Sequence, residues 1–268
     1  MSRIDQIFTD LRSQRLAALL PFVTAGYPSL DATAAVIPAI EKAGSHIIEI
    51  GFPFSDPIAD GPVIAASMHE ALKRGVTPGA IFDMVRGIRA PTALGVVAMV
   101  SMSIVHRLSP EVFIEQAASA GFDGLIIPDS DLAEAAALSI MAHQSGLAFI
   151  PLISPTTSPQ RLKSIVSIAS GFLYVLARVG ITGESATAPA TAIARRIAEI
   201  RTISDLPVAV GFGISKPEHV AAVVEVADGA IVGSALVRRM GESPDPVQAA
   251  ADFVAHLAAG LRRPAPAN

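Results

Sequence analysis

The stretch His46-Ile47-Ile48-Glu49-Ile50-Gly51 is short, rich in isoleucine and apolar at nearly every position. A strand with one solvated face alternates apolar and polar residues, whereas a strand of a parallel sheet is covered on both faces and is apolar throughout. The stretch therefore predicts a buried parallel strand. Glu49 interrupts it with a carboxyl group that the same strand would bury.

Similar apolar runs recur along the chain, and longer segments of helical period separate them. With the first, they number about eight, at 19–23, 46–50, 94–100, 124–127, 148–153, 173–176, 208–210 and 230–232. Eight strands alternating with helices are what a closed (β/α)8 barrel, the TIM barrel, requires. We therefore expect the α/β class, with a single barrel domain over residues 1–262 and a frayed tail over 263–268.

The segments between these runs carry helix start and stop signals. A hydroxyl residue precedes proline at Thr77-Pro78, Ser109-Pro110 and Ser158-Pro159, and Ser215 with Glu218 resembles a capping box. Gly44, Gly121, Gly146 and Gly171 stand where helices would end in a left-handed residue. An extra helix before the first strand places Ile4, Ile7, Phe8 and Leu11 on one face, where they could plug the bottom of the barrel.

Composition excludes several classes of protein. The 268 residues carry a net charge of -4 without runs of Lys or Arg, which argues against nucleic acid or an anionic membrane surface as partner. The absence of Cys excludes disulfides, thiolate nucleophiles and Cys-based metal sites. No apolar run reaches the about 18 residues of a membrane span, and the first residues lack a secretion signal. We expect a cytoplasmic, soluble protein whose large apolar fraction fills a core, a partner interface or both.

Active sites of TIM barrels lie at the carboxyl ends of the strands. Three glycine sites fall there: Thr182-Gly183 after the sixth run, Gly211-Phe212-Gly213 after the seventh and Gly233-Ser234 after the eighth. Each glycine could be only a turn or a cap, but together they favour a phosphate site, with a short helix beginning at Ser234.

Glu49 and the loop after it are the other candidates. A buried carboxyl group has a raised pKa and suits general acid catalysis, although an ion pair with an arginine would also explain its burial. Residues 51–62 form an unusually Pro- and Gly-rich loop that contains Asp56 and Asp60. Asp56-Pro57 also fits a turn, and Asp60 also fits the N-cap of the helix beginning near Pro62.

The remaining chemistry is narrowed by what the sequence lacks. Lys42, Lys73, Lys163 and Lys216 all fall on helices or helix starts, so no strand-end amine is expected for a Schiff base. The six histidines are scattered, which argues against a metal site. We expect no cofactor, and acid–base chemistry by carboxylates on a phosphorylated substrate, which must itself absorb electrons if a C–C bond breaks.

The sequence resembles the family of tryptophan synthase α subunits over nearly its whole length. The matching motifs, in the order of the family, are Pro21-Phe22-Val23-Thr24-Ala25-Gly26, Glu49-Ile50-Gly51, Pro53-Phe54-Ser55-Asp56-Pro57, Ala59-Asp60-Gly61-Pro62, Ile181-Thr182-Gly183, Gly211-Phe212-Gly213-Ile214 and Gly233-Ser234. The loop after Glu49 is the specific part of this match, whereas phosphate-binding glycines occur in many barrels.

The resemblance implies a lyase that cleaves indole-3-glycerol phosphate to indole and glyceraldehyde 3-phosphate. It implies that Glu49 is the general acid–base and that Asp60 accepts a hydrogen bond from the indole N–H. By the same resemblance the substrate is bound by Phe22, Met99, Ile126, Tyr174, Thr182, Gly183, Phe212, Gly213, Ile231, Gly233 and Ser234. A pyridoxal-phosphate β subunit would be the partner in an α2β2 tetramer, facing Pro53, Asp56 and Asp131, and we expect an exposed apolar patch around these three residues.

Two stretches depart from the pattern of the family. Ser101-Met102-Ser103 stands where Tyr-x-Asn is common, and Asp129-Ser130-Asp131 stands where Asp-x-Pro is common. These departures leave a second hypothesis, a catalytically weakened α-like subunit that binds and activates a β subunit. A third hypothesis is another phosphate-binding barrel, such as an isomerase, but it leaves the loop after Glu49 unexplained.

Overall fold

The computed structural model describes residues 2–57, 61–177, 190–211 and 213–263. Its strands are β1 (Ala18–Thr24), β2 (Ile47–Gly51), β3 (Gly95–Met99), β4 (Gly124–Ile126), β5 (Ala148–Phe149), β6 (Leu152–Ile153), β7 (Leu173–Leu176), β8 (Val208–Gly211) and β9 (Gly229–Val232). They are all parallel and lie in the order β5-β4-β3-β2-β1-β9-β8-β7-β6.

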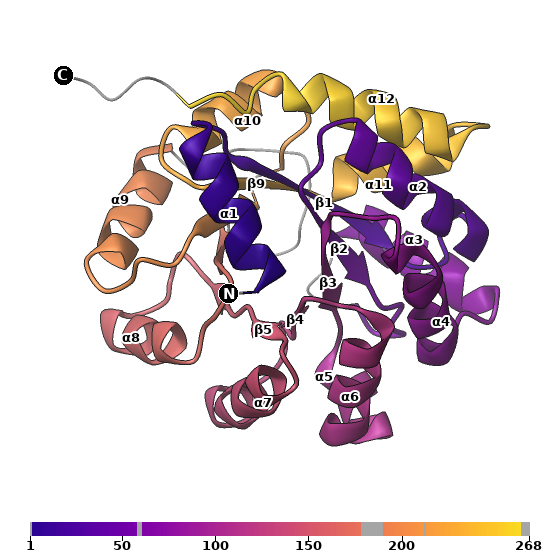
Figure 1. Ribbon diagram of the computed structural model, residues 1–268, viewed down its shortest axis with the longest axis horizontal. Coiled ribbons are helices and arrows are strands. Elements are labelled where there is room, and N and C mark those ends of the chain that lie inside the picture. The colour runs from indigo at the N-terminus through magenta and orange to yellow at the C-terminus, as the bar shows by residue number, and fades with distance from the viewer. Residues whose placement is uncertain (1, 58–60, 178–189, 212, 264–268) are drawn as a thin grey trace.

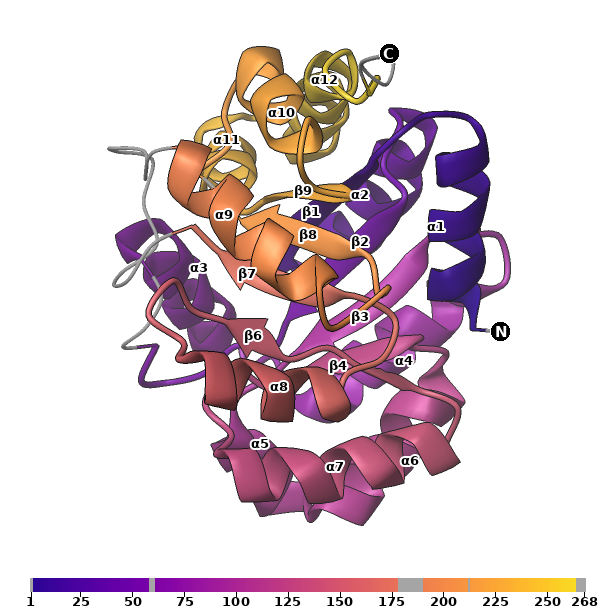
Figure 2. The same ribbon diagram turned by 90° about the vertical axis from the view of Figure 1, so that its left-hand side faces the viewer.

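Helices surround these strands (Figures 1 and 2). They are α1 (Arg3–Ser13), α2 (Leu30–Lys42), α3 (Pro62–Lys73), α4 (Pro78–Arg89), α5 (Met102–Leu108), α6 (Pro110–Ala120), α7 (Leu132–Gln144), α8 (Pro159–Ser167), α9 (Ala190–Arg201), α10 (Pro217–Val224), α11 (Ser234–Glu242) and α12 (Pro246–Ala258). Within the described ranges, no helix is both long enough and apolar enough to cross a membrane.

The predicted run 148–153 is wrong as one continuous strand, because it is divided into β5 and β6. Pro151 has no N–H group and cannot donate to a ladder, so regular pairing stops there. Ile150 still donates to the Leu125 carbonyl (2.9 Å), and Tyr174 donates to the Pro151 carbonyl (3.3 Å). This segment therefore joins β4 on one side to β7 on the other and completes the predicted TIM barrel.

Both faces of the strands are buried, as their composition predicts. Ile48 and Ile50 belong to the cluster between the strands and the outer helices, whereas Ile47 belongs to a separate cluster inside the barrel. Side chains alternate along a strand, so this division also fixes which way Glu49 points.

Helix α1 closes one end of the barrel, which confirms the predicted plug (Figure 2). Ile4, Phe8 and Leu11 are buried in the interior cluster. Glycine makes room for them where the strands begin, since a Cβ at Gly124 would lie 3.2 Å from Ile4 and one at Gly171 would lie 3.3 Å from it. Large side chains on α1 therefore fill this end of the barrel, and glycines near the strand starts leave the space for them.

The predicted caps are present on the outer helices. Thr77, Ser109 and Ser158 are N-caps whose hydroxyl groups accept backbone N–H bonds, with proline at the first helical position. The four predicted left-handed glycines, Gly44, Gly121, Gly146 and Gly171, all have φ between 74° and 104°.

An aspartate stabilises the barrel at two equivalent places. Asp123 immediately precedes β4 and accepts from the Val96 N–H of β3 (2.8 Å) and from Arg89 of α4 (2.8 and 2.9 Å). Asp228 immediately precedes β9 and accepts from the Val208 N–H of β8 (2.9 Å). With β5 and β6 counted as one strand, these aspartates precede the fourth and eighth strands of the barrel. The same hydrogen bond, from an N–H of the preceding strand to an aspartate, therefore occurs in both halves.

Asp228 is the more strongly paired of the two. Arg201 of α9 donates to it at 2.9 Å and Arg263 donates at 2.7 Å, and the chain stays anchored through Arg263. Burial alone would raise the pKa of Asp228, but the hydrogen bonds from Arg263 and Val208, with the charges of Arg201 and Arg263, hold the pKa below its ordinary value of 3.8.

Asp228→Asn is expected to lower the free energy of unfolding by about 2 kcal/mol at neutral pH, because charge-assisted hydrogen bonds are lost. A group with a lowered pKa stabilises the fold above its unfolded-state pKa, and this contribution disappears as the pH falls through its folded-state pKa. Urea unfolding at several pH values should show the difference from the wild type shrinking below pH 3.8. The exposed Asp83→Asn is the control; an equal loss in both variants would contradict the prediction.

Candidate active site

Glu49 points into the barrel from β2, on the same face of the strand as Ile47. It lies beside Phe22 of β1 and Val97 of β3 in the sheet register. Its side chain is 0% exposed, and neither carboxyl oxygen has a hydrogen-bond partner among the described residues. Burial raises the pKa of Glu49 well above its ordinary value of 4.5, because an apolar interior disfavours the charged carboxylate.

The other buried charged residue in the described ranges, Asp228, is fully paired and has a lowered pKa. Asp228 has two arginines and a backbone N–H as partners, which explains its burial structurally. Glu49 has no arginine partner there, so the ion-pair alternative fails for the described part of the chain. An unpaired acid inside the barrel costs stability, and such groups occur mainly at functional sites.

The apolar residues predicted to bind the substrate, here called the wall residues, lie around the same interior where the structure describes them. Met99, Ile126, Tyr174 and Ile231 belong to the interior cluster, and Phe22 belongs to an adjacent cluster that Met99 also contacts. That second cluster includes Ile64 and Met68 of α3 and Val237 of α11. The structure therefore brings five predicted residues from five strands into one apolar enclosure with Glu49.

The predicted glycines at the ends of β8 and β9 also come together. Gly211 of β8 is paired with Ile231 of β9, so the loops that follow are neighbours. Gly213 has the left-handed φ of +63°, and Gly233 is the N-cap of α11, which begins at Ser234 as predicted. A helix N-terminus next to a glycine loop is suited to an anion. Thr182, Gly183, Phe212 and Asp60 lie outside the described residues.

The predicted capping box at Ser215 is wrong. Lys216 is the N-cap of α10, and it makes no side-chain cap bond. The His219 ring instead accepts from the Ser215 N–H through Nδ1 (3.4 Å). A histidine folded back on its own helix start has no distinctive spacing, so the sequence indicated only a surface residue.

The expected partner surface is only partly as predicted. Asp56 is exposed, but Pro53 is buried. Asp131 is exposed and is the N-cap of α7, where it accepts from the Ala133 and Glu134 N–H groups. The expected apolar patch is not found among the described residues there, because the exposed large apolar side chains, Val112, Ile140 and Ile203, lie elsewhere. The core accounts for the apolar composition.

The family departures have structural roles that sequence reasoning missed. Ser101 is the N-cap of α5, and its hydroxyl group donates to Asp129 (2.7 Å). Sequence reasoning also missed a second contact, unrelated to these departures. The His69 ring of α3 contacts the Ser55 carbonyl (3.2 Å) and so connects α3 to the loop after Glu49. A serine before a helix is a recognisable N-cap signal in a sequence, whereas a contact between separate segments leaves no such pattern.

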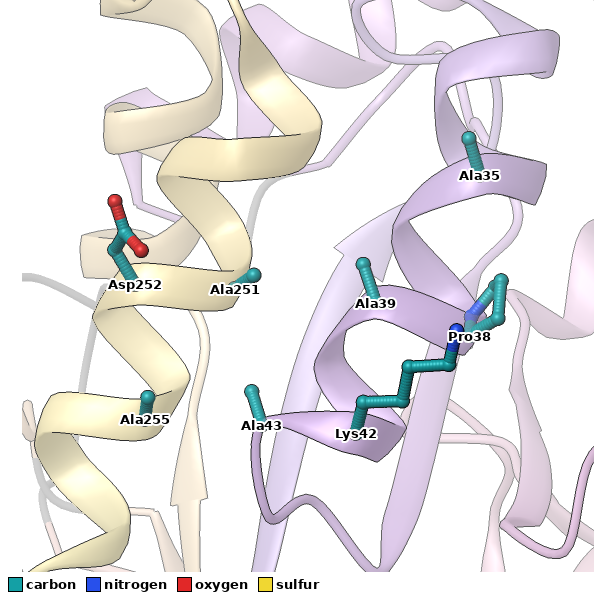
Figure 3. A pocket seen from close by; sticks show the side chains of 8 residues that line it. All are labelled: Ala35, Pro38, Ala39, Lys42, Ala43, Ala251, Asp252 and Ala255. Atoms are coloured by element: carbon teal, nitrogen blue, oxygen red, sulfur yellow. The ribbon is translucent and has the colours of Figure 1, made fainter.

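A groove of about 440 Å³ lies outside the barrel, between α2 and α12 (Figure 3). Alanines of the two helices face one another across it, and Lys42 and Asp252 lie at its edges. None of the predicted site residues lines this groove. The groove follows from small side chains where two helices pack, and it lies apart from the candidate site inside the barrel.

The closed parallel barrel defines a TIM-barrel protein, and its candidate active site contains a buried carboxyl group with no hydrogen-bond partner among the described residues. The sequence model of the family "Tryptophan synthase alpha chain" matches residues 8–263. The chain belongs to this family.

Individual relatives agree with this assignment. The tryptophan synthase alpha chain of Halorhodospira halophila is 44% identical over 90% of this chain and 89% of its own, and that of Rhodopirellula baltica is 39% identical over 98% of both. A structure of Mycobacterium tuberculosis tryptophan synthase superposes with a TM-score of 0.89 at 33% identity, covering 97% of this chain and 98% of the other. The alpha subunit of Legionella pneumophila gives 0.88 at 34% identity, covering 96% and 97%.

Gly51→Ala is expected to lower the free energy of unfolding by about 1–3 kcal/mol through overpacking. A Cβ there would lie 2.4 and 2.6 Å from two ring atoms of the buried Phe22. Gly87→Ala in α4 is the matched control, since its Cβ would meet nothing within 4 Å. It should raise the unfolding free energy by about 0.5–1 kcal/mol, because alanine favours a helix interior over glycine. Urea titration measures both, and a Gly51→Ala protein as stable as the wild type would contradict the proposed contact.

Proposed function

We propose that this protein is a lyase that cleaves indole-3-glycerol phosphate to indole and glyceraldehyde 3-phosphate in tryptophan biosynthesis. The observation that carries the proposal is the Glu49 carboxyl group, fully buried, unpaired among the described residues and raised in pKa. The chain that contains Glu49 belongs to the tryptophan synthase alpha chain family, and the proposed reaction is the one that the resemblance to this family implies.

In the proposed reaction Glu49 moves one proton in each direction. It first donates its proton to C3 of the indole ring, which leaves a positive indolenine. Glu49, now a carboxylate, then takes the proton of the glycerol hydroxyl next to the ring. The bond between C3 and the glycerol carbon breaks, its electron pair returns to the ring, and the hydroxyl carbon becomes the aldehyde of glyceraldehyde 3-phosphate. Glu49 ends protonated, so it is regenerated.

The other residues hold the substrate in this proposal. Asp60 accepts a hydrogen bond from the indole N–H and stabilises the positive intermediate. The indole ring lies against an apolar wall of Phe22, Met99, Ile126, Tyr174, Phe212 and Ile231. The phosphate is held by Thr182, Gly183, Gly213, Gly233 and Ser234, supported by the φ of Gly213 and the N-terminus of α11. No cofactor is required, since the ring itself accepts the electrons.

We further propose a pyridoxal-phosphate β subunit as the partner, in an α2β2 tetramer located in the cytoplasm. Asp56 and Asp131 would face it directly. The burial of Pro53 gives it an indirect role, since it supports the loop that presents the exposed Asp56. Within the chain we propose one domain over residues 1–262, followed by a tail over 263–268 whose first residue, Arg263, is still anchored to Asp228.

Glu49→Gln is expected to abolish indole release, and Asp60→Asn to reduce kcat at least about a hundredfold, because each removes a group that acts on the reacting ring. Indole release can be measured by extracting the uncharged indole into an organic solvent, which leaves the phosphorylated substrate in water. Wild-type activity in Glu49→Gln would refute the assigned role.

The same Glu49→Gln variant tests the raised pKa. A carboxyl group whose pKa is raised by folding lowers the stability as the pH rises from its unfolded-state pKa through its folded-state pKa. The variant lacks this titration, so its unfolding free energy should vary less than that of the wild type between about pH 4.5 and the alkaline range. Identical pH profiles would show that Glu49 titrates normally.

Adding a tryptophan synthase β subunit should raise the rate of indole release about fivefold or more, the usual lower range of coupling between linked sites. The comparison measures indole release and tryptophan formation with each subunit alone and with both. No change in either reaction would rule out the proposed partnership, whereas activation of the β reaction without cleavage would favour the weakened subunit.

A further inference from the structure

The loops that follow β3 and β4 are joined by one carboxylate. Asp129 Oδ2 accepts from the Ser101 hydroxyl group (2.7 Å), and Asp129 Oδ1 accepts from the Met102 N–H (2.8 Å). A second link lies farther out, where His106 Nε2 contacts Glu134 Oε1 at 3.1 Å. The two loops are therefore held together at the mouth of the barrel by side chains as well as by the sheet.

This link begins where the ladder between β3 and β4 ends. Met99 and Ile126 are register partners, and the Val100 N–H donates to the Ile126 carbonyl at 3.0 Å. Ser101 comes two residues after Met99, and Asp129 comes three residues after Ile126. Both wall residues thus sit immediately before the segment that Asp129 fastens.

Local capping does not explain Asp129. Helix α7 is capped by Asp131, whose carboxylate accepts from Ala133 and Glu134. Helix α5 has its own cap in Ser101, whose hydroxyl oxygen accepts from the Ser103 N–H at 3.3 Å. The hydrogen bonds of the Asp129 side chain within the described residues all cross to the other loop. Its role is to connect the loops.

We propose that Ser101 and Asp129 form a positioning pair that fixes Met99 and Ile126 as one wall of the aryl-binding site. This inference deepens the proposed function and rests on it. The pair touches no reacting atom and acts through the two apolar residues. It contributes equally to the ground state and the transition state, so its loss raises KM more than it lowers kcat.

A double-mutant cycle tests the pair. Asp129→Ala is expected to raise KM for indole-3-glycerol phosphate about tenfold, the effect of losing one charge-assisted hydrogen bond, with kcat changed less than about twofold. Ser101→Ala should raise KM about threefold. The double variant should be no worse than Asp129→Ala, because the two residues act as one unit. Asp129→Asn should restore most of the affinity, since its amide can accept from the Met102 N–H and donate to the Ser101 hydroxyl group.

Two further measurements keep the test decisive. The first is the Kd of indole, measured by indole fluorescence because the chain contains no tryptophan, and this Kd should rise together with KM. If the wild type binds indole but does not cleave the substrate, the proposed function fails, and the Kd of indole still tests the pair. Thr77→Ala removes a matched helix cap on α4 and should leave KM unchanged. Multiplicative effects in the cycle, or a loss of unfolding free energy with KM and Kd unchanged, would overturn the proposal.

Discussion

The fold and the candidate site both depend on a closed parallel barrel whose interior is apolar and which encloses the Glu49 carboxyl group, unpaired among the described residues. The interior can be sealed because α1 fills one end with Ile4 and Phe8, and because glycines at the strand starts leave space for them. Sealing removes water from Glu49, and desolvation alone is what raises its pKa. The packing of α1 therefore contributes to the raised pKa of Glu49, although the two lie at different levels of the barrel.

The paired and unpaired carboxyl groups of the described residues lie at different levels of the strands. Asp123 and Asp228 precede β4 and β9, at the ends where those strands begin, and their arginine partners satisfy them there. Glu49 is the central residue of β2, so it lies farther along the barrel than the strand starts. Fully paired carboxylates can fix the positions of neighbouring strands, whereas an unpaired one is left free to exchange its proton with a ligand.

The residues that depart from the family pattern are integrated into the structure. Ser101 and Asp131 each cap a helix, and the capping by Asp131 leaves Asp129 free to reach the neighbouring loop. Asp131 thus starts α7 and supplies a carboxylate that a proline at this position would lack. These are local adjustments, and they leave the apolar wall below them in place.

The sequence by itself determined the repeating strands, most helix caps and the anomaly of Glu49, because these depend on periodicity and on the chemistry of single residues. Family resemblance also predicted a set of substrate-binding residues, and five of them lie around the barrel interior. Sequence reasoning misjudged the run 148–153, where one proline divides the strand, and Ser215, where a histidine replaces the cap. Only the tertiary structure decided that Glu49 has no arginine beside it in the described chain, that Pro53 is buried and that Asp129 reaches Ser101. Those facts depend on which residues distant in sequence meet in space, and the closure of the barrel decides that, not any local pattern.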